Sequence, residues 1–348
     1  MCMFRAVLIS IFLTSTAITS FAGQSTPWDN ILEAVLFTSS STDLDNNGET
    51  NVGDLLILIS EWGTCSECLS DIDQDGVVNV SDLLMLIKSW GPNETIDLDE
   101  IDVQSAGVPC FSYGPDGELI QMFQWFPNGD NSLDFIARRV STDQGETWSE
   151  IQGIQWSKGP TEHSTQADPS LVWFEDEDTW RLYFTCDIDA NGPGLPVTYS
   201  AISNDALNFE WEDWETPRMS LEDSGLLDPS VIFFNEEYHF FAPVPGQSYG
   251  SIYATSSDGI TFKRHDNINV DGRNDTKFMG NPAVVNDKLY FFGTLEDPKE
   301  DAWAGIFYAE SDDAINWTVL FEEWGEVADP AGIQTENGLL IFKTALHN

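Results

Sequence analysis

The sequence has few basic residues. Of its 348 residues only 14 are Lys or Arg, whereas 59 are Asp or Glu, so the formal net charge is -45. A surface this negative repels nucleic acid and anionic lipid, which excludes a nucleic-acid-binding protein. The sequence also has no apolar run long enough to cross a bilayer, so no transmembrane anchor is expected. Its 41% hydrophobic and 12% aromatic residues nevertheless predict a folded protein with a sizeable core.

The first residues have the three regions of a secretory signal peptide. Arg5 is followed by an apolar stretch over residues 6–13 and then by small and hydroxyl-bearing residues that end at Ala22. Cleavage is predicted after Ala22, so residues 1–22 would be a signal peptide. We therefore expect a secreted, extracellular protein.

Cysteine is scarce, with five copies. A zinc site at Cys65 and Cys68 would need two further ligands nearby, and no His or Cys supplies them. In an oxidising compartment the four cysteines after the signal peptide permit two disulfides. The simplest pairing joins Cys65 to Cys68 and Cys110 to Cys186.

A twelve-residue acidic segment occurs twice, at 43–54 and at 71–82. Calcium takes six to eight oxygen ligands, and a loop of this length supplies them from positions 1, 3, 5, 7, 9 and 12, with Gly at position 6. The predicted ligands are Asp43, Asp45, Asn47, the carbonyl of Glu49, Asn51 and Asp54 in the first loop, and Asp71, Asp73, Asp75, the carbonyl of Val77, Asn79 and Asp82 in the second. The pattern predicts two structural calcium ions.

Each loop is followed by apolar residues at helical spacing. They are Val52, Leu55, Leu56, Ile59 and Trp62 after the first loop, and Val80, Leu83, Leu84, Ile87 and Trp90 after the second. Gly63 and Gly91 are placed as C-terminal caps. Because two such short helices bury little surface alone, calcium binding is expected to couple to folding.

The duplicated loop and helix resemble the type I dockerin modules of cellulosome enzymes. The likeness includes both loops, both Leu-Leu helices and Asp at position 12. It implies binding of two Ca²⁺ ions and a cohesin-like docking partner. Type I dockerins often carry Ser-Thr at loop positions 10 and 11, whereas this sequence has Val52-Gly53 and Val80-Ser81. A calcium-stabilised spacer or an unrelated protein-docking module is the alternative interpretation.

After an acidic linker over residues 93–106, short runs rich in Val, Phe, Tyr and Trp predict an all-β domain. Several of these runs open with Asp-Pro or an equivalent pair. The pairs begin at Val108, Asp168, Asp228, Asn281 and Asp329. Their spacing is that of one four-stranded propeller blade.

The units also share a turn in which Ser and Asp stand two residues apart. The pairs are Ser141 and Asp143, Ser203 and Asp205, Ser256 and Asp258, and Ser311 and Asp313. Such side chains satisfy backbone donors in tight turns, so the turns are predicted to be structural rather than catalytic. The segment from Ser141 to Trp148 resembles the Asp-box of sialidases.

The fold prediction is mainly β: a five-bladed β-propeller over residues 107–348, preceded by a small α-helical, calcium-binding, dockerin-like module over 41–92 and a lead-in over 23–40. The fifth unit has only residues 329–348, enough for two strands. Either residues 96–106 complete this blade or the ring closes loosely. A sandwich or a β-helix is the alternative fold.

The Asp-Pro units resemble the five-bladed propellers of glycoside hydrolase families 43 and 32. The resemblance implies hydrolysis of glycosidic bonds by carboxyl groups at the starts of the inner strands, for which Asp168, Asp228 and Asp329 are the candidates. Two of them would act as base and transition-state stabiliser, and a Glu would act as acid. These families also place an Asp in the first blade, where this sequence has Val108.

The general acid has no motif of its own. Glu162, Glu222 and Glu296 are candidates only because they lie near blade openings. His163 and His239 are isolated, so neither a histidine metal centre nor a nucleophilic triad is predicted. In the structural interpretation, each Asp-Pro pair simply caps a turn and fixes the chain.

Three functions fit these observations. The first is a secreted glycoside hydrolase that degrades polysaccharide and docks through its calcium module. The second is a non-catalytic propeller that binds glycans or proteins, with some of the 13 Trp residues as stacking platforms. The third is a structural component of an extracellular assembly.

Overall fold

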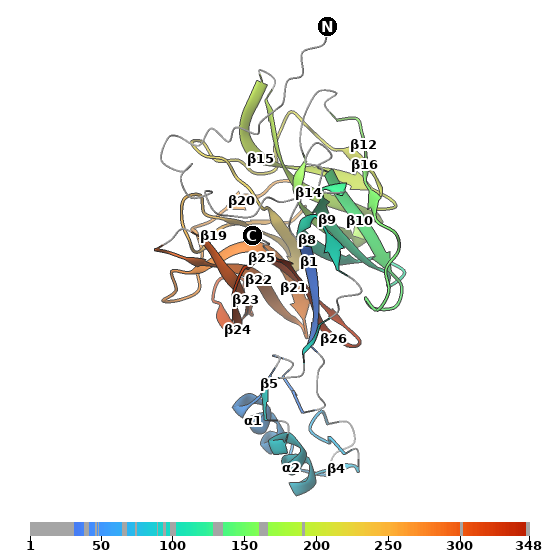
Figure 1. The fold of residues 1–348 in the computed structure, drawn as a ribbon, viewed down its shortest axis with the longest axis vertical. Helices are drawn as coiled ribbons and strands as arrows, with labels where there is room; N and C mark the ends of the chain where they lie inside the picture. The colour runs from blue at the N-terminus through green and yellow to red at the C-terminus, as the bar shows by residue number, and fades with distance from the viewer. Residues whose placement is uncertain are drawn as a thin grey trace.

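The computed structural model has five small β-sheets arranged as the blades of a propeller, with two helices at one end of the molecule (Figure 1). It describes residues 31–345 except 38–41, 46, 48, 65–67, 74, 89, 93–94, 98–101, 128–134, 160–165, 190–191 and 300–301. The predicted signal peptide lies outside these residues. Within them, the α-helices are α1 (Val52–Ser60) and α2 (Val80–Lys88). The prediction of a mainly β, five-bladed propeller is confirmed.

Four blades follow one another along the chain, each running from its inner strand outward. The first has β8 (Ala106–Tyr113), β9 (Leu119–Trp125), β10 (Phe135–Ser141) and β11 (Gln152–Gly153). The second has β13 (Ala167–Phe174), β14 (Thr179–Asp189), β15 (Gly192–Ser203) and β16 (Asn208–Trp211), with β12 (Gln155–Ser157) outside β16 and a 3-10 turn, η5 (Glu175–Glu177), after β13. The third has β17 (Ser230–Phe234), β18 (Glu237–Pro243), β19 (Ser251–Ser256) and β20 (Lys263–Arg264). The fourth has β21 (Thr276–Val285), β22 (Lys288–Asp297), β23 (Ala302–Ser311) and β24 (Thr318–Trp324).

The middle strands account for the apolar runs in the sequence. In β22, every residue from Leu289 to Glu296 is buried. Neighbouring blades cover both faces of such a strand, so hydrophobic residues need not alternate with polar ones. The cores accordingly lie between blades, as in the cluster of Phe241, Phe278, Phe291 and Trp317 from the third and fourth blades.

The fifth blade joins both ends of the described chain. Its inner strands are β25 (Val327–Thr335) and β26 (Gly338–Ala345). Strand β1 (Ile31–Phe37) pairs antiparallel with β26 along its whole length. Strands β6 (Thr95–Asp97) and β7 (Val103–Gln104) then pair with the outer side of β1. Hydrogen bonds between early and late strands therefore close the ring and cover the edge of β26.

This closure changes the predicted order of the parts. The sequence predicts a lead-in over 23–40, but β1 is the third strand of the last blade. Residues 96–106 contribute to the same blade through β6 and β7, which was one of the two predicted alternatives. The two-helix segment, residues 42–92, lies between β1 and β6 and is thus inserted into the fifth blade instead of preceding the propeller. The pairing of β1 with the other end of the chain carries no local sequence signal.

The Ser and Asp turns connect the third and fourth strands of the first four blades. In the first blade the Ser141 hydroxyl donates to Asp143 Oδ1 at 2.7 Å and accepts from the Gly145 N–H at 2.8 Å. The matching Ser–Asp distances in the other three blades are 2.9, 2.7 and 3.2 Å. These bonds support the predicted structural role. In the fifth blade the two-helix segment takes the place of this turn.

Two short strand pairs and a small core hold the two-helix segment together. Strand β2 (Glu49–Thr50) pairs with β5 (Gly91–Pro92), and β3 (Gly63–Thr64) pairs with β4 (Val77–Val78). A capping box formed by Asn51 and Asp54 begins α1. The buried core consists of Leu58, Ile72, Val78 and Leu86.

The predicted cysteine pairing is wrong for one pair. Cys110 and Cys186 remain thiols, and both pack into the apolar core between the first and second blades. Burial raises the pKa of the Cys110 thiol to about 12, so this thiol stays protonated. Cys68 is part of a disulfide; its predicted partner, Cys65, lies outside the described residues.

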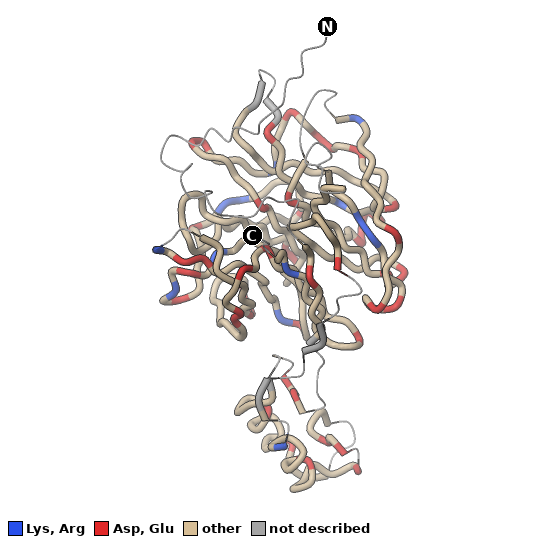
Figure 2. Tube along the Cα trace, in the orientation of Figure 1, with Lys and Arg blue, Asp and Glu red and all other residues tan. Residues whose placement is uncertain are grey.

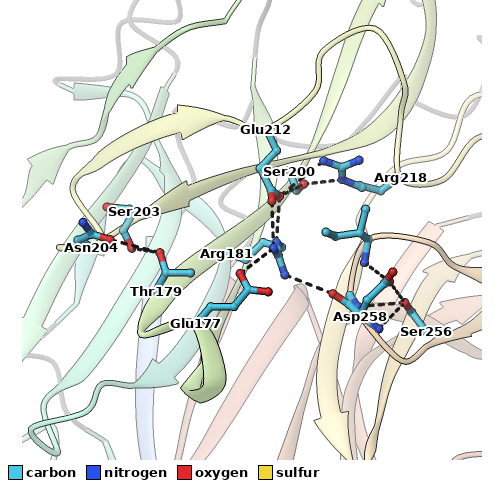
Figure 3. A network of polar contacts seen from close by, with 12 residues as sticks. Glu177, Thr179, Arg181, Ser200, Ser203, Asn204, Glu212, Arg218, Ser256 and Asp258 are labelled. Carbon is cyan, nitrogen blue, oxygen red and sulfur yellow. Dashed lines mark hydrogen bonds and ion pairs between the residues drawn. The ribbon is translucent and has the colours of Figure 1, made fainter.

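A buried ionic network joins the second and third blades (Figure 3). Arg181 on β14 donates to both carboxylate oxygens of Glu212, at 2.9 and 3.0 Å, and to Glu177 at 3.2 Å. Its guanidinium also lies 4.0 Å from the ring centre of Phe174. These three partners all belong to the second blade, and Arg181 reaches the third blade through Nη1, which donates to the Asp258 carbonyl at 3.5 Å.

Acidic residues are spread along the propeller and the two-helix segment, whereas basic residues are few (Figure 2). In the part of the chain that the structure describes, neither helix has the length and apolar character needed to span a membrane.

Candidate functional site

Three Asp residues stand where the inner strands of three blades begin. Asp168 and Asp329 lie near the starts of β13 and β25, and Asp228 lies two residues before β17. All three have left-handed backbone, with φ of 54°, 44° and 49°. In β13 and β25 the register with the next strand shifts at the Asp-Pro pair. Such a bulge takes the Asp out of the regular ladder.

The carboxyl groups of these three residues converge. The Asp228 backbone N–H donates to Asp168 Oδ2 at 3.1 Å. The charges of Asp168 and Asp329 both act on Asp228, and that of Asp168 acts on Asp329. Asp168 and Asp329 are buried, with 9% and 6% exposure, whereas Asp228 keeps more accessible surface. The structure thus brings together the three residues that the sequence predicted to meet near the propeller axis.

Burial raises the pKa of all three carboxyl groups, because an ionised carboxylate loses its hydration there. Burial, and then the charge of Asp168, raises the pKa of Asp329 to about 7. Burial, followed by the charges of Asp168 and Asp329, raises the pKa of Asp228 well above its usual range. Burial also raises the pKa of Asp168, against the opposing hydrogen bond from the Asp228 N–H. Of the three, Asp329 thus has a pKa close to neutral pH, beside two carboxyl groups whose pKa values are also raised.

Lys277 is a member of the site that sequence reasoning missed. Its ammonium group donates to Glu296 Oε2 at 2.5 Å, and its charge lowers the pKa values of Asp228 and Asp329. Glu296, one of the predicted acid candidates, is buried beside it with 2% exposure. The only available signal was that a basic residue is rare in this sequence.

The other predicted residues lie elsewhere. Glu222 is exposed on the connection between the second and third blades. Glu162 and His163 lie outside the described residues. The buried ring of His239 is bonded to Tyr253 Oη at 2.9 Å and to the Phe234 carbonyl at 3.0 Å, which indicates a structural role.

The fourth blade departs from the predicted repeat. Its register shift falls between Lys277 and Gly280, so Met279 lies at the shift, whereas Asn281 pairs regularly with Phe292. Asp168 and Asp329 each follow directly after the last regular pair before the shift, whereas Asn281 stands three residues beyond the equivalent position, Phe278. Asn281 instead bonds the first blade, through Nδ2 to the Pro109 carbonyl at 2.9 Å.

The first blade shows whether the bulge itself requires Asp, because Val108 stands there in place of Asp. Val108 adopts the same left-handed backbone, with φ of 50°, at the same register shift. A β-branched residue is the least suited to this conformation. Because Val108 nevertheless adopts it, the bulge does not require Asp, and the burial of the Asp168 and Asp329 carboxyl groups at such bulges calls for another explanation.

The two acidic loops form two groups that could hold metal ions. Carboxylate oxygens of Asp43, Asp45 and Asp54 lie within 4.8 Å of one another, as do those of Asp71, Asp73 and Asp82. These residues are half of the predicted calcium ligands. Oxygen-only donors clustered at this range suit a hard cation such as Ca²⁺.

The remaining predicted ligands shape the same loops. Asn47 and Asp75 donate backbone N–H groups to the first Asp of their loops, each at 3.1 Å. Asn51 and Asn79 donate theirs to the last Asp, at 2.7 and 2.8 Å. Glu49 and Val77 lie in β2 and β4. Each loop therefore holds together a group of three carboxylates that could bind a metal ion.

No family model and no curated protein matches the sequence. Among solved structures, a GH32 beta-fructofuranosidase from Bombyx mori aligns with a TM-score of 0.51 and 16% identity, over 68% of this chain and 54% of that one. A beta-fructofuranosidase from Schwanniomyces occidentalis gives a TM-score of 0.51 and 15% identity, over 67% and 50%. The chain thus spans about half the length of these two structures. At these identities, the likeness shows a shared propeller fold alone.

Proposed function

We propose that this protein is a glycoside hydrolase whose site is the carboxyl cluster of Asp168, Asp228 and Asp329. The observation that carries the proposal is that three carboxyl groups from three blades meet with raised pKa values. Hydrolysis of a glycosidic bond needs one carboxyl group that donates a proton and one that stays ionised. A cluster in which burial and mutual repulsion hold protons near neutral pH supplies both.

The electrostatics support separate roles within the cluster. Asp228 is repelled by both neighbours and is the most accessible of the three, so it is the proton donor to the leaving oxygen. Asp168 accepts the Asp228 N–H, which favours its ionised form, so it is the base or nucleophile. The charge of Asp329 raises the pKa of Asp228, and the opposite charge of Lys277 lowers it.

The test is sugar release from a panel of polysaccharides and aryl glycosides by the full chain with calcium. Asp228→Asn and Asp168→Asn should each lower kcat by at least about 100-fold, the scale of general acid–base catalysis. Asp116→Asn, at an exposed turn between β8 and β9, is the matched control and should leave kcat unchanged. Equal rates for all three variants would rule out this site.

A non-catalytic glycan-binding propeller is the second candidate. It is favoured by Val108, which stands where the resembled hydrolase families have an Asp. Under this alternative, the protein binds polysaccharide without releasing sugar, and Asp228→Asn leaves the bound amount unchanged.

We further propose that the two-helix segment is a calcium-dependent, dockerin-like docking module of a secreted protein. Equivalent apolar residues of the two repeats are exposed to nearly the same extent, as in Leu56 and Leu84, both at 61%, and Trp62 and Trp90, both at 47%. Large apolar patches of this kind commonly mark protein-binding sites. Pull-down of the full chain with a cohesin domain, with and without EGTA, tests the proposal; calcium-independent capture or no capture would contradict it.

A further inference from the structure

Two exposed aromatic side chains lie on the side of the ring where the inner strands begin. Trp324, the last residue of β24, is 54% exposed, and Tyr249, between β18 and β19, is 37% exposed. Successive strands of a blade run in opposite directions, so the fourth strand ends on the side where the next inner strand starts. Trp324 is therefore on the same side of the ring as Asp329, which follows five residues later.

Hydrogen bonds orient the Trp324 ring. Its indole Nε1 donates to Glu322 Oε2 at 3.1 Å, and the other oxygen of Glu322 accepts from Arg273. Arg273 Nε in turn donates to Asp275 Oδ1 at 2.8 Å. The ring is thus fixed through its edge, while more than half of its surface remains exposed. An aromatic ring held in this way loses little conformational entropy on binding a ligand.

The same bonds lead to the carboxyl cluster. The carbonyl of Asp275 accepts the Glu296 N–H at 2.9 Å, and the Glu296 carboxylate accepts from Lys277. The Lys277 charge acts on Asp228 and Asp329. Hydrogen bonds therefore connect Trp324 to Lys277, whose charge acts on two carboxyl groups of the cluster.

Tyr249 borders the same segment from the third blade. The neighbouring Ser248 hydroxyl donates to the Asn274 carbonyl at 3.2 Å, and the Gly250 N–H donates to the Thr276 carbonyl at 2.9 Å. The loop of Tyr249 and the end of β24 thus both contact segment 273–277, so the two aromatic residues flank it.

We propose that this surface, defined by Trp324, Tyr249, Arg273 and Glu322, is a subsite that binds an uncharged sugar ring next to the one held at the carboxyl cluster. A sugar ring presents C–H groups on its faces and hydroxyl groups on its edge. Trp324 stacks against the face, and the polar groups of Arg273 and Glu322 bind the edge. The proposal deepens the proposed function and rests on it.

Charge selects a neutral sugar. Three carboxyl groups, Glu296 and a net charge of -45 oppose a uronic acid or a sulfated sugar. Within the described residues of this surface, the cations already have carboxylate partners: Lys277 pairs with Glu296, and Arg273 pairs with Asp275 and Glu322. An anionic sugar would have to displace one of these pairs.

The test measures binding and hydrolysis separately. Binding of inulin, arabinan and xylan to the full-length Asp228→Asn protein is followed by affinity electrophoresis, with polygalacturonate as the anionic control. Trp324→Ala in that background should weaken binding of a neutral polysaccharide by about tenfold or more, as expected for a central Trp contact. Trp324→Phe should recover part of it. Phe233→Ala, an exposed aromatic residue near the end of β17 and so on the other side of the ring, is the matched control and should bind normally. Sugar release is measured separately, with the same substitutions made in the chain that keeps Asp228.

The outcomes separate the two proposals. Binding that needs Trp324 but is accompanied by no release supports the subsite and overturns the hydrolase. If sugar is released and Trp324→Ala does not weaken binding, the subsite is overturned and the hydrolase proposal stands. Preference for polygalacturonate overturns the neutral-sugar assignment, and no binding and no release overturns both proposals.

Discussion

The Tyr308 hydroxyl donates a hydrogen bond of 2.8 Å to the backbone carbonyl of Asn47. Tyr308 lies on β23 of the fourth blade, and Asn47 lies in the first acidic loop. Glu310, two residues along the same strand, is near enough for its charge to act on Asp45. The first loop therefore rests against the propeller, and its proposed calcium ion would stabilise that contact.

Calcium removal should destabilise the propeller as well as the two-helix segment. An ion present at about 100 times its Kd stabilises the native state by about 2.7 kcal/mol, which corresponds to several degrees in Tm. EGTA should therefore lower the Tm of the full chain in scanning calorimetry. Asp43→Ala should remove most of this effect on the propeller, whereas Asp71→Ala, in the loop without the bond to Tyr308, should remove less. If EGTA left the Tm of the propeller unchanged, the coupling between calcium binding and propeller stability would be contradicted.

The raised pKa of Asp329 gives stability a defined pH dependence. Because its folded pKa, about 7, exceeds the unfolded value of about 3.9, the native state binds more protons than the unfolded state between these values. The contribution of Asp329 to the free energy of unfolding therefore falls as pH rises from about 4 to 7 and levels off above. Urea unfolding at several pH values should show this fall in the wild type and a flatter profile in Asp329→Asn. Parallel profiles would show that Asp329 titrates normally.

The ionic network of Arg181 should contribute strongly to stability. The Arg181 side chain is 2% exposed and that of its partner Glu212 is 14% exposed. Arg181→Leu would leave Glu212 without its bidentate partner, at a cost of about 3–5 kcal/mol in the free energy of unfolding. Lys158→Ala, which removes an exposed pair with Glu210, should cost less than about 1 kcal/mol. Urea unfolding of both variants measures the difference, and equal losses would argue against the buried network.

Strand β1 should be essential to the fifth blade, although it lies far in the sequence from β25 and β26 of the same blade. Leu32 on β1 is fully buried in the core of the first and fifth blades. Leu32→Ala should lower the free energy of unfolding by about 2–5 kcal/mol. Leu56→Ala, at an exposed position of α1, should change it little. If Leu32→Ala unfolds like the wild type, β1 does not close the ring.

The acidic loops and the blades were accessible to sequence reasoning because their signals are local. Position 12 of each loop must be an oxygen donor whatever lies around it, and the turn at Ser141 and Asp143 closes within a few residues. Asp168 and Asp329 could be singled out for the same reason, since an Asp-Pro pair at a strand start is a local pattern. The offset of Asn281 was hidden, because only the register of β21 against β22 shows that Phe278 holds the equivalent position.

The sequence by itself determined the composition of the parts: an acidic surface, two loops with carboxylates at fixed spacing, and repeated β units with Asp at their openings. Only the tertiary structure decided that β1 closes the last blade, that the two-helix segment is inserted there, and that Lys277 joins the carboxyl cluster. These relationships are set by contacts between residues far apart in the chain. Such contacts depend on the packing of blades around a common axis, which no local pattern of residues records.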